Sequence, residues 1–220
     1  LSEPATQMTM RTYHFAGTAG IQVTLGLPRL LEIFDARKEP RTPAMTVYIR
    51  KEFQDVEQVK KIAERVKEVK FKDVVLSTLL DLTDLWIKCE LNIPKMKSLD
   101  IDPKSLEKLI KIRNTNVTQE KNSLVVAPKK SDLANLHKLK YSLLETHIKG
   151  IKGITQVVVT KEEDEWVINS LGSNLKKAFE IEGVDSTRTI SNNIFEVADV
   201  LGIEAARNVI IKQSQYTIEE

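Results

Sequence analysis

Four side chains near the start of the chain have types and spacing that suit work on a charged substrate. Gln7, Met10, Arg11 and His14 stand at offsets of three, four and seven residues, which places them on one face of a helix. An imidazolium can donate a proton or stabilise negative charge, and a guanidinium binds oxygen atoms. A histidine beside aromatic residues is also commonly a packing residue. The spacing alone therefore leaves a substrate-binding role and a packing role open.

The segment after these residues is predicted to contain a flexible break followed by a helix. Residues 17–20 (Gly-Thr-Ala-Gly) are predicted to be a hinge, since they lack the glycine order and the lysine of a phosphate-binding loop. Pro28 suits the first turn of a helix, which is expected to end before Pro40. The apolar face of that helix is predicted to contain Leu30, Leu31, Ile33 and Phe34.

Composition limits the class of protein. The chain has 220 residues, 41% hydrophobic and 29% charged, with 33 basic against 31 acidic side chains. A net charge of +2 does not mark a protein that binds nucleic acid by bulk charge alone. Cys89 is the single cysteine, which excludes a disulfide within the chain and a cysteine-based metal site. No apolar run reaches the length of a membrane span, so we expect no membrane association and a cytoplasmic protein.

The middle of the chain alternates between strand and helix patterns. Apolar residues at every second position predict a strand over 45–49, and helical spacing predicts a helix that Asp55 caps. Pro94 is expected to break the pattern, and residues 114–122 are expected to form a polar loop. Further strands are predicted at 74–76, 85–91, 124–126, 154–160 and 166–169, and further helices after Asp102 and Ser131.

The last fifty residues are mainly helical in pattern. Helices are predicted over 174–179, from Ile194 to Leu201, and from Ile203 to Ile218. The fold class is therefore α+β, a mixed strand and helix domain followed by a helical segment. We predict three regions, at 1–44, 45–170 and 171–220, and we expect the chain to be a piece of a longer polypeptide.

Three other groups of residues suggest sites, and each also has a simpler explanation. Asp100 and Asp102 flank a helix start, where carboxylates usually cap the helix, so no metal site is predicted. His137 and His147 are ten positions apart, which rotates them away from each other on a helix. The basic side chains between 138 and 152 form either a solvated face or a DNA-binding stripe, and both remain open; these are Lys138, Lys140, Lys149 and Lys152.

The order of residues in several segments resembles one family. The stretch from Glu3 to Gly17 resembles the trigger loop of multisubunit RNA polymerases, in the form found in the largest subunit of archaeal and eukaryotic enzymes. Residues 23–33 resemble the helix that follows that loop. Residues 148–154 resemble the segment that leads out of the jaw. Residues 191–194 and 200–207 resemble the cleft region. The whole is similar to the archaeal A'' polypeptide, the separately encoded C-terminal part of the largest subunit.

The resemblance implies roles for the four opening residues. A trigger loop folds over the incoming nucleoside triphosphate, so His14 would approach the triphosphate as the catalytic residue and Met10 would pack on the base. Gln7 and Arg11 would reach towards the ribose, although Arg11 departs from the asparagine usual in the eukaryotic form. The acid and the positional role of His14 both stay open.

The resemblance also implies that the chain depends on other parts of an enzyme. The catalytic Mg²⁺ is expected in the other part of the largest subunit, so the isolated chain is expected to lack cofactors and polymerase activity. Implied partners are the A', B and H polypeptides and other small subunits, downstream DNA held by the jaw, nucleoside triphosphates and a transcript-cleavage factor. The alternative function is a noncatalytic structural or protein-interaction module of a larger assembly.

Overall fold

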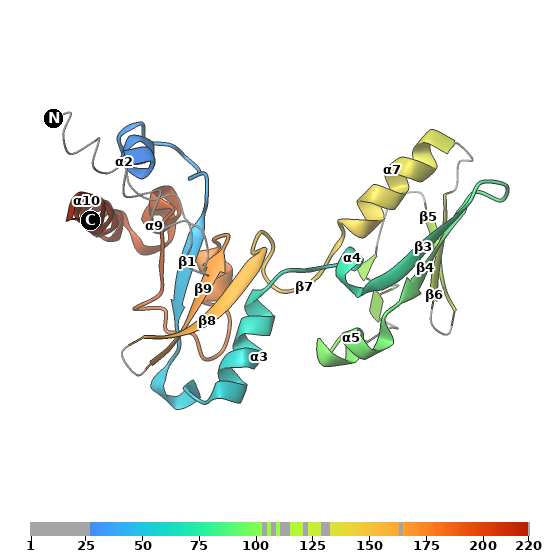
Figure 1. The fold of residues 1–220 in the computed structure, drawn as a ribbon, viewed down its shortest axis with the longest axis horizontal. Coiled ribbons are helices and arrows are strands. Elements are labelled where there is room, and N and C mark those ends of the chain that lie inside the picture. The colour runs from blue at the N-terminus through green and yellow to red at the C-terminus, as the bar shows by residue number, and fades with distance from the viewer. Residues whose placement is uncertain are drawn as a thin grey trace. The chain divides into compact units, whose positions relative to one another are not determined.

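The computed structural model describes residues 27–102, 105–106, 109–110, 115–120, 123–128, 133–162 and 165–219. These residues form two compact units (Figure 1). Unit 1 consists of the described residues of 1–67 and 151–220, and unit 2 consists of those of 68–150. Unit 2 is therefore a continuous insertion between the two halves of unit 1.

Unit 1 is built on a four-stranded antiparallel sheet. Its strands are β1 (Ala44–Tyr48), β8 (Gln156–Glu162), β9 (Glu165–Leu171) and β10 (Ile190–Ser191), in the order β10-β1-β9-β8. The central pair places Met45 opposite Ser170 and Val47 opposite Ile168. Because side chains alternate across a strand, Met45, Val47 and Ile49 all point into the core, as the sequence pattern predicted.

Helices complete the core of unit 1. Helix α3 (Val56–Val66) packs against β8 and β9 through Val59, Ile62 and Val66, which are buried. Helices α9 (Ile194–Leu201) and α10 (Ile203–Glu219) pack against each other, and α2 (Leu27–Phe34) packs against α10. Two short elements lie in connecting segments: the 3-10 helix η2 (Lys51–Phe53) lies between β1 and α3, and α8 (Leu175–Ala178) lies between β9 and β10.

Unit 2 has its own antiparallel sheet. The strands β3 (Val75–Asp81), β4 (Trp86–Leu91), β6 (Ser123–Pro128) and β5 (Thr115–Glu120) lie side by side in that order. Helix α7 (Leu133–Leu144) lies along one face and contacts β4 and β6 (Figure 1). Two shorter helices, α4 (Phe71–Val74) and α5 (Ile93–Ser98), pack against each other. The alternation along β4 buries Ile87, Cys89 and Leu91 in this core.

The two ends of unit 2 meet. Strands β2 (Val69–Lys70) and β7 (His147–Lys149) form a separate antiparallel pair in which Val69 is opposite Lys149. On the unit 1 side, the N–H group of Ile151 donates to the carbonyl of Val66 at 3.2 Å. The chain thus enters and leaves the insertion at neighbouring positions.

The α+β class is confirmed, but several predicted elements are wrong. Residues expected to form a polar loop contain β5, because its register with β6 pairs Val117 with Val126 and satisfies the backbone of an otherwise polar segment. Pro94 does not end regular structure. It lies in the first turn of α5, where its missing N–H costs nothing, and Asn92 caps that helix. The strand predicted over 74–76 begins at Val75, because Val74 closes α4.

The compact units divide the chain differently from the three predicted regions. The predicted region 45–170 combines β1, β8 and β9 with the strands of unit 2, whereas β1 shares its sheet with β10 from the last predicted region. The assignment of parts of this chain to a trigger loop, a jaw and a cleft stays a prediction. Among the described residues, no helix is both long enough and apolar enough to cross a bilayer.

Candidate functional site

The four predicted site residues, Gln7, Met10, Arg11 and His14, lie outside the described residues. The described part of the chain begins further along, with α2 at Leu27. Helix α2 is the described element that follows those four residues most closely in the sequence.

A buried arginine holds α2. Arg29 is 6% exposed and its guanidinium reaches three partners. Nε and Nη2 donate to Gln213 Oε1 of α10 at 3.1 and 2.7 Å, and Nη2 donates to the carbonyl of Asn192 at 2.5 Å. Nη1 donates to Glu32 Oε2, one turn along α2, at 2.8 Å. A buried charge needs such partners, because an isolated ion in a low-dielectric interior is strongly unfavourable.

Glu32 completes the ion pair from the same helix. Its side chain is 4% exposed, and the spacing of three residues places it beside Arg29. Its second oxygen, Oε1, accepts the N–H group of Arg41 at 3.3 Å and lies 3.8 Å from the Arg41 Nε. Glu32 thereby joins α2 to the loop that leads into β1.

Asn192 connects the same cluster to the first strand. Its Oδ1 accepts the N–H group of Ala44 at 2.8 Å, and its Nδ2 donates to the carbonyl of Thr42 at 2.8 Å. Its own N–H donates to the carbonyl of Ala44 at 3.0 Å. We call Arg29, Glu32, Asn192 and Gln213 the α2 anchor. It fixes α2 to α10, to the β10–α9 junction and to the start of β1.

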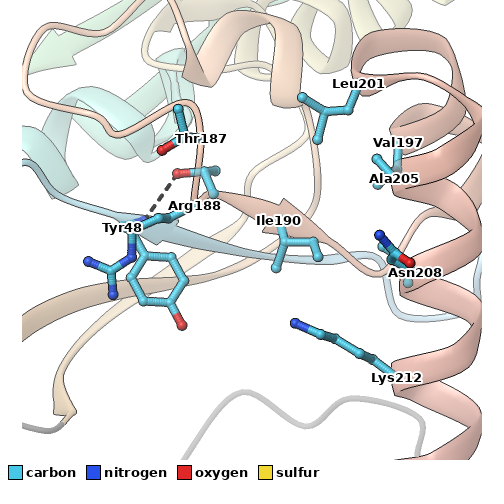
Figure 2. Close-up of a pocket in the computed structure, with 11 residues that line it drawn as sticks. Tyr48, Thr187, Arg188, Ile190, Val197, Leu201, Ala205, Asn208 and Lys212 are labelled. Carbon is cyan, nitrogen blue, oxygen red and sulfur yellow. Dashed lines mark hydrogen bonds between the residues drawn. The ribbon is translucent and has the colours of Figure 1, made fainter.

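A cavity of about 400 Å³ opens on another part of unit 1 (Figure 2). Tyr48 and Arg188 lie on one side, and Asn208 and Lys212 extend from α10 on the other. The Arg188 guanidinium stacks 4.5 Å above the centre of the Tyr48 ring. The remaining lining is mostly apolar and comes from Ile190, Val197, Leu201, Ala205 and Val209, together with Thr187 and Thr189.

Arg188 at this cavity and Asp185 beside it have partners that stabilise their charged forms. Arg188 Nη1 lies 2.6 Å from Glu165 Oε2, and that carboxylate raises the pKa of the guanidinium. The Thr187 hydroxyl donates to Asp185 at 2.6 Å and lowers the pKa of the Asp185 carboxyl, which stays ionised. The lining contains no thiol, imidazole or carboxylate to act as nucleophile or base. The lining combines hydroxyl groups and the Lys212 amine with an apolar surface, which suits binding of a small molecule.

The other candidates from the sequence are not brought together. Asp100 lies on the surface 3.8 Å from Lys149, and no cluster of metal-ligating side chains occurs within the described ranges. His147 Nε2 lies 2.9 Å from the carbonyl of Gly150, whereas His137 is exposed on α7.

The four lysines of the suggested basic stripe lie on different elements and are divided between the two units. Lys138 and Lys140 are on α7, whereas Lys149 donates to the carbonyl of Leu99 at 2.6 Å. Lys152 belongs to unit 1 and the other three to unit 2.

The α2 anchor was not predicted from the sequence. The predicted apolar face of the helix contains Leu31 and Phe34, yet these are 53% and 77% exposed, and the buried positions include Arg29 and Glu32. A usable signal was present: an arginine and a glutamate three residues apart between leucines, a spacing that allows a pair to form within the helix. The partner Gln213 is too distant in sequence to be found in that way.

Comparison with known proteins agrees with the resemblance found in the sequence. The sequence model of the family described as RNA polymerase Rpb1, domain 5, matches residues 1–220. The chain is also 40% identical over 224 aligned residues to the DNA-directed RNA polymerase subunit Rpo1C of Thermococcus gammatolerans. That alignment covers all of this chain and 57% of the relative, so the chain spans little more than half of the relative's length. The chain belongs to the RNA polymerase Rpb1 domain 5 family, the C-terminal part of the largest polymerase subunit.

Proposed function

We propose that the chain acts within a DNA-directed RNA polymerase, as a part of the largest subunit that contributes to nucleotide addition. The observation that carries this proposal is the 40% identity to subunit Rpo1C over the full length of the chain. Polymerase activity is a property of the assembled enzyme, with Mg²⁺ held by the other part of the largest subunit. The chain alone is inactive, and the enzyme works in the cytoplasm.

The residues proposed to meet the substrate are those of the opening stretch. His14 approaches the triphosphate, where an imidazolium stabilises developing charge or gives a proton to the leaving pyrophosphate. Met10 packs on the base of the incoming nucleotide, and Gln7 and Arg11 reach the ribose. Closure of this stretch over a matched nucleotide couples base selection to rate.

The test is single-nucleotide addition by the reconstituted polymerase. Replacement His14→Ala is expected to lower the rate constant at saturating nucleotide by about 10²-fold, the lower end of what a positioned acid contributes. Binding of the DNA template should not change. His137→Ala is the matched control, because His137 is an exposed histidine on α7. Equal addition rates for His14→Ala and the wild type would refute the assignment.

Unit 2 is proposed to form part of the jaw that holds downstream DNA and meets small subunits and a transcript-cleavage factor. Its edge strand β3 supports a role in contacts between subunits, because Leu76 and Leu79 are 67% and 54% exposed there. A noncatalytic interaction module is the second candidate function, and the same exposed residues favour it. The two differ in the outcome of the His14→Ala test, since a noncatalytic module predicts no change in the addition rate.

A further inference from the structure

The cavity of about 400 Å³ in unit 1 lies among residues that the proposed contacts with the nucleotide do not involve. Its walls come from β1, from residues 187–190, from α9 and from α10, all within unit 1 (Figure 2). Small-molecule sites commonly have volumes of roughly 300–1,000 Å³ and combine apolar walls with a few polar groups. Both the volume and the composition of this cavity match that description.

Hydrogen-bond donors line the cavity without acceptors to match them. Lys212 forms no ion pair with any residue that the structure describes, and Asn208 lies one turn before it on α10. The hydroxyl group of Tyr48 has no hydrogen-bond partner within the described ranges. An amine donates three hydrogen bonds and accepts none, and the described lining contains no carboxylate. The cavity therefore suits a ligand that supplies acceptor oxygens and a negative charge.

Arg188, the second cation at the cavity, already has partners. Its Nη1 lies 2.6 Å from Glu165 Oε2, and its guanidinium stacks 4.5 Å above the centre of the Tyr48 ring. The backbone of Tyr48 is held as well, because its N–H group donates to the Thr189 hydroxyl at 3.2 Å. In Figure 2 the hydroxyl end of Tyr48 and the amine end of Lys212 extend toward each other from opposite sides of the cavity. An acid group between them has a donor on each side.

The apolar part of the lining offers surface for the rest of such a ligand. Leu201 is 39% exposed and Ile190 is half-buried, whereas Val197 and Val209 behind them are buried. The exposed part of this surface gains free energy when a ligand removes it from water. An anion with an apolar body is therefore favoured over an inorganic anion.

We propose that this cavity binds a small organic acid, a molecule with one apolar ring or branched chain and one carboxylate or phosphate group. The acid group lies between the Lys212 amine and the Tyr48 hydroxyl, and the Asn208 amide donates to it from the same side as Lys212. The apolar body lies against Ile190 and Leu201. A bound acid joins α10 to β1 and thereby stabilises unit 1. This site is independent of the residues proposed to meet the nucleotide.

The experiment titrates the ¹⁵N-labelled 220-residue chain with phenyl phosphate and with benzoate and follows the amide signals by NMR. Signals of residues 188–190 and 205–212 should move, with a Kd of about 1 mM, usual for a ligand of roughly ten non-hydrogen atoms. Lys212→Met should weaken binding about 10-fold, because a hydrogen bond to a charged group is lost, and Tyr48→Phe about 3-fold. Lys60→Met is the matched control and should leave the Kd unchanged, since Lys60 is exposed on α3 and does not line the cavity.

Two further probes separate the acid group from the apolar body. Benzyl alcohol has the ring without the charge, and inorganic phosphate has the charge without the ring. Each should bind about 10-fold more weakly than the better of the two acids. Tighter binding of benzoate or of phenyl phosphate identifies which acid group the cavity takes, and either result supports the proposal.

Four results would overturn the proposal. They are no movement of the cavity signals at about 20 mM of either acid, equal weakening by Lys60→Met and Lys212→Met, benzyl alcohol binding as tightly as the acids, and inorganic phosphate doing so. Thermal unfolding gives a second measurement that needs no signal assignment. About 10 mM of the better acid should raise the midpoint more for the wild type than for Lys212→Met, and an equal rise in both would also count against the site.

Discussion

At the scale of single residues, the clearest constraint in unit 1 is steric. Gly172 has φ +107°, and a Cβ atom built on it would lie 2.1 Å from the carbonyl oxygen of Gly153 and 2.8 Å from the Cα of Ile154. Both are backbone atoms, so no side chain can move aside. Gly172 also donates its N–H to the carbonyl of Pro43 at 2.7 Å, which fixes its position at the end of β9. Only glycine fits there.

We therefore predict that Gly172→Ala destabilises unit 1 by about 3 kcal/mol or more, the sum of backbone strain and overpacking. Gly202→Ala is the matched control. Gly202 has φ +94° but nothing lies within 4 Å of its added Cβ, so it should lose only the strain term, about 1–3 kcal/mol. Urea unfolding followed by circular dichroism measures both. Equal losses for the two variants would contradict the role given to the close approach.

The single cysteine gives a pH-dependent prediction. Burial raises the pKa of the Cys89 thiol from 9.0 to about 11, an effect that the neighbouring Thr78 hydroxyl partly opposes. Below pH 9 the thiol is protonated in both the folded and the unfolded state, so its contribution to stability is fully present. Between pH 9 and about 11 the unfolded chain loses the proton first, and stability falls.

The expected loss is about 2–3 kcal/mol by pH 11, from a shift of roughly two pKa units. Lysines and tyrosines also titrate in this range, so the measurement is the difference between the wild type and Cys89→Ala in unfolding free energy as pH rises. The variant should lack the additional decline, although the cavity that it creates lowers its stability at every pH. Parallel pH curves for the two proteins would show that the thiol does not titrate as described.

The sequence predicted some of these residues and missed others for identifiable reasons. Alternation along 45–49 was enough to assign Met45, Val47 and Ile49 to the core, because period two leaves one face buried. Burial of Arg29 and Glu32 could not be inferred in that way. Their environment is created by Asn192 and Gln213, more than one hundred and fifty positions later in the chain.

At the scale of elements, two residues in the N-cap position differ in whether they form a capping hydrogen bond. Asn193 precedes α9, and its side chain accepts the N–H group of Glu196 at 3.3 Å. Asp55 occupies the same position before α3 with an extended backbone, but its side chain makes no capping hydrogen bond. The sequence predicted Asp55 as a cap from its type alone. Residue type gives the preference, and the rotamer in the folded chain decides whether the bond forms.

We predict that Asn193→Ala lowers the free energy of unfolding of unit 1 by about 1 kcal/mol, the usual value of an N-cap. Asp55→Ala should lower the free energy of unfolding by no more than about 0.3 kcal/mol, since it removes only a weak interaction with the helix dipole. Chemical unfolding of each variant beside the wild type gives the comparison. A larger loss for Asp55→Ala than for Asn193→Ala would be inconsistent with the capping geometry.

Strands, like helix caps, cannot always be predicted from local residue types. The polar composition of segment 114–122 predicts a loop. Strand β5 forms there nevertheless, because β6 supplies hydrogen-bonding partners from Ser123 to Pro128. Pairing across a sheet can override local propensity, and pairing is not encoded in the segment itself. By contrast, α3, α9 and α10 were predictable because a sustained helical pattern stands in their own sequence.

At the scale of the whole chain, the two units have separate cores. One apolar cluster contains Phe71, Ile87, Leu124 and Leu143 and draws only on residues of unit 2. The other contains Val47, Val59, Ile168 and Val197 and draws only on unit 1. No buried residue belongs to both clusters among those that the structure describes. Each unit therefore has its own source of apolar stabilisation.

This separation predicts that residues 68–150 fold alone. The segment has about 80 residues, a size at which independent domains occur. Its ends are already paired through Val69 and Lys149 in β2 and β7, so excision leaves no strand without its partner. We expect a cooperative thermal transition by circular dichroism in the excised segment. Leu143→Ala should lower that transition temperature, because Leu143 is fully buried in the same core.

Unit 1 should likewise survive removal of the insertion. The carbonyl of Val66 and the N–H of Ile151 lie 3.2 Å apart, so a linker of about three Gly and Ser residues can join residue 67 to residue 151 without strain. The shortened chain is expected to unfold cooperatively, and Leu143 is absent from it, so Gly172→Ala provides the matching core test there. Loss of cooperative unfolding in both pieces, with cooperative unfolding in the intact chain, would mean that the units stabilise each other and that the insertion is not autonomous. If each piece unfolds as a single transition, a polymerase built with the linker in place of residues 68–150 can separate the proposed jaw functions of unit 2 from nucleotide addition, because the residues proposed to meet the nucleotide lie outside the removed segment.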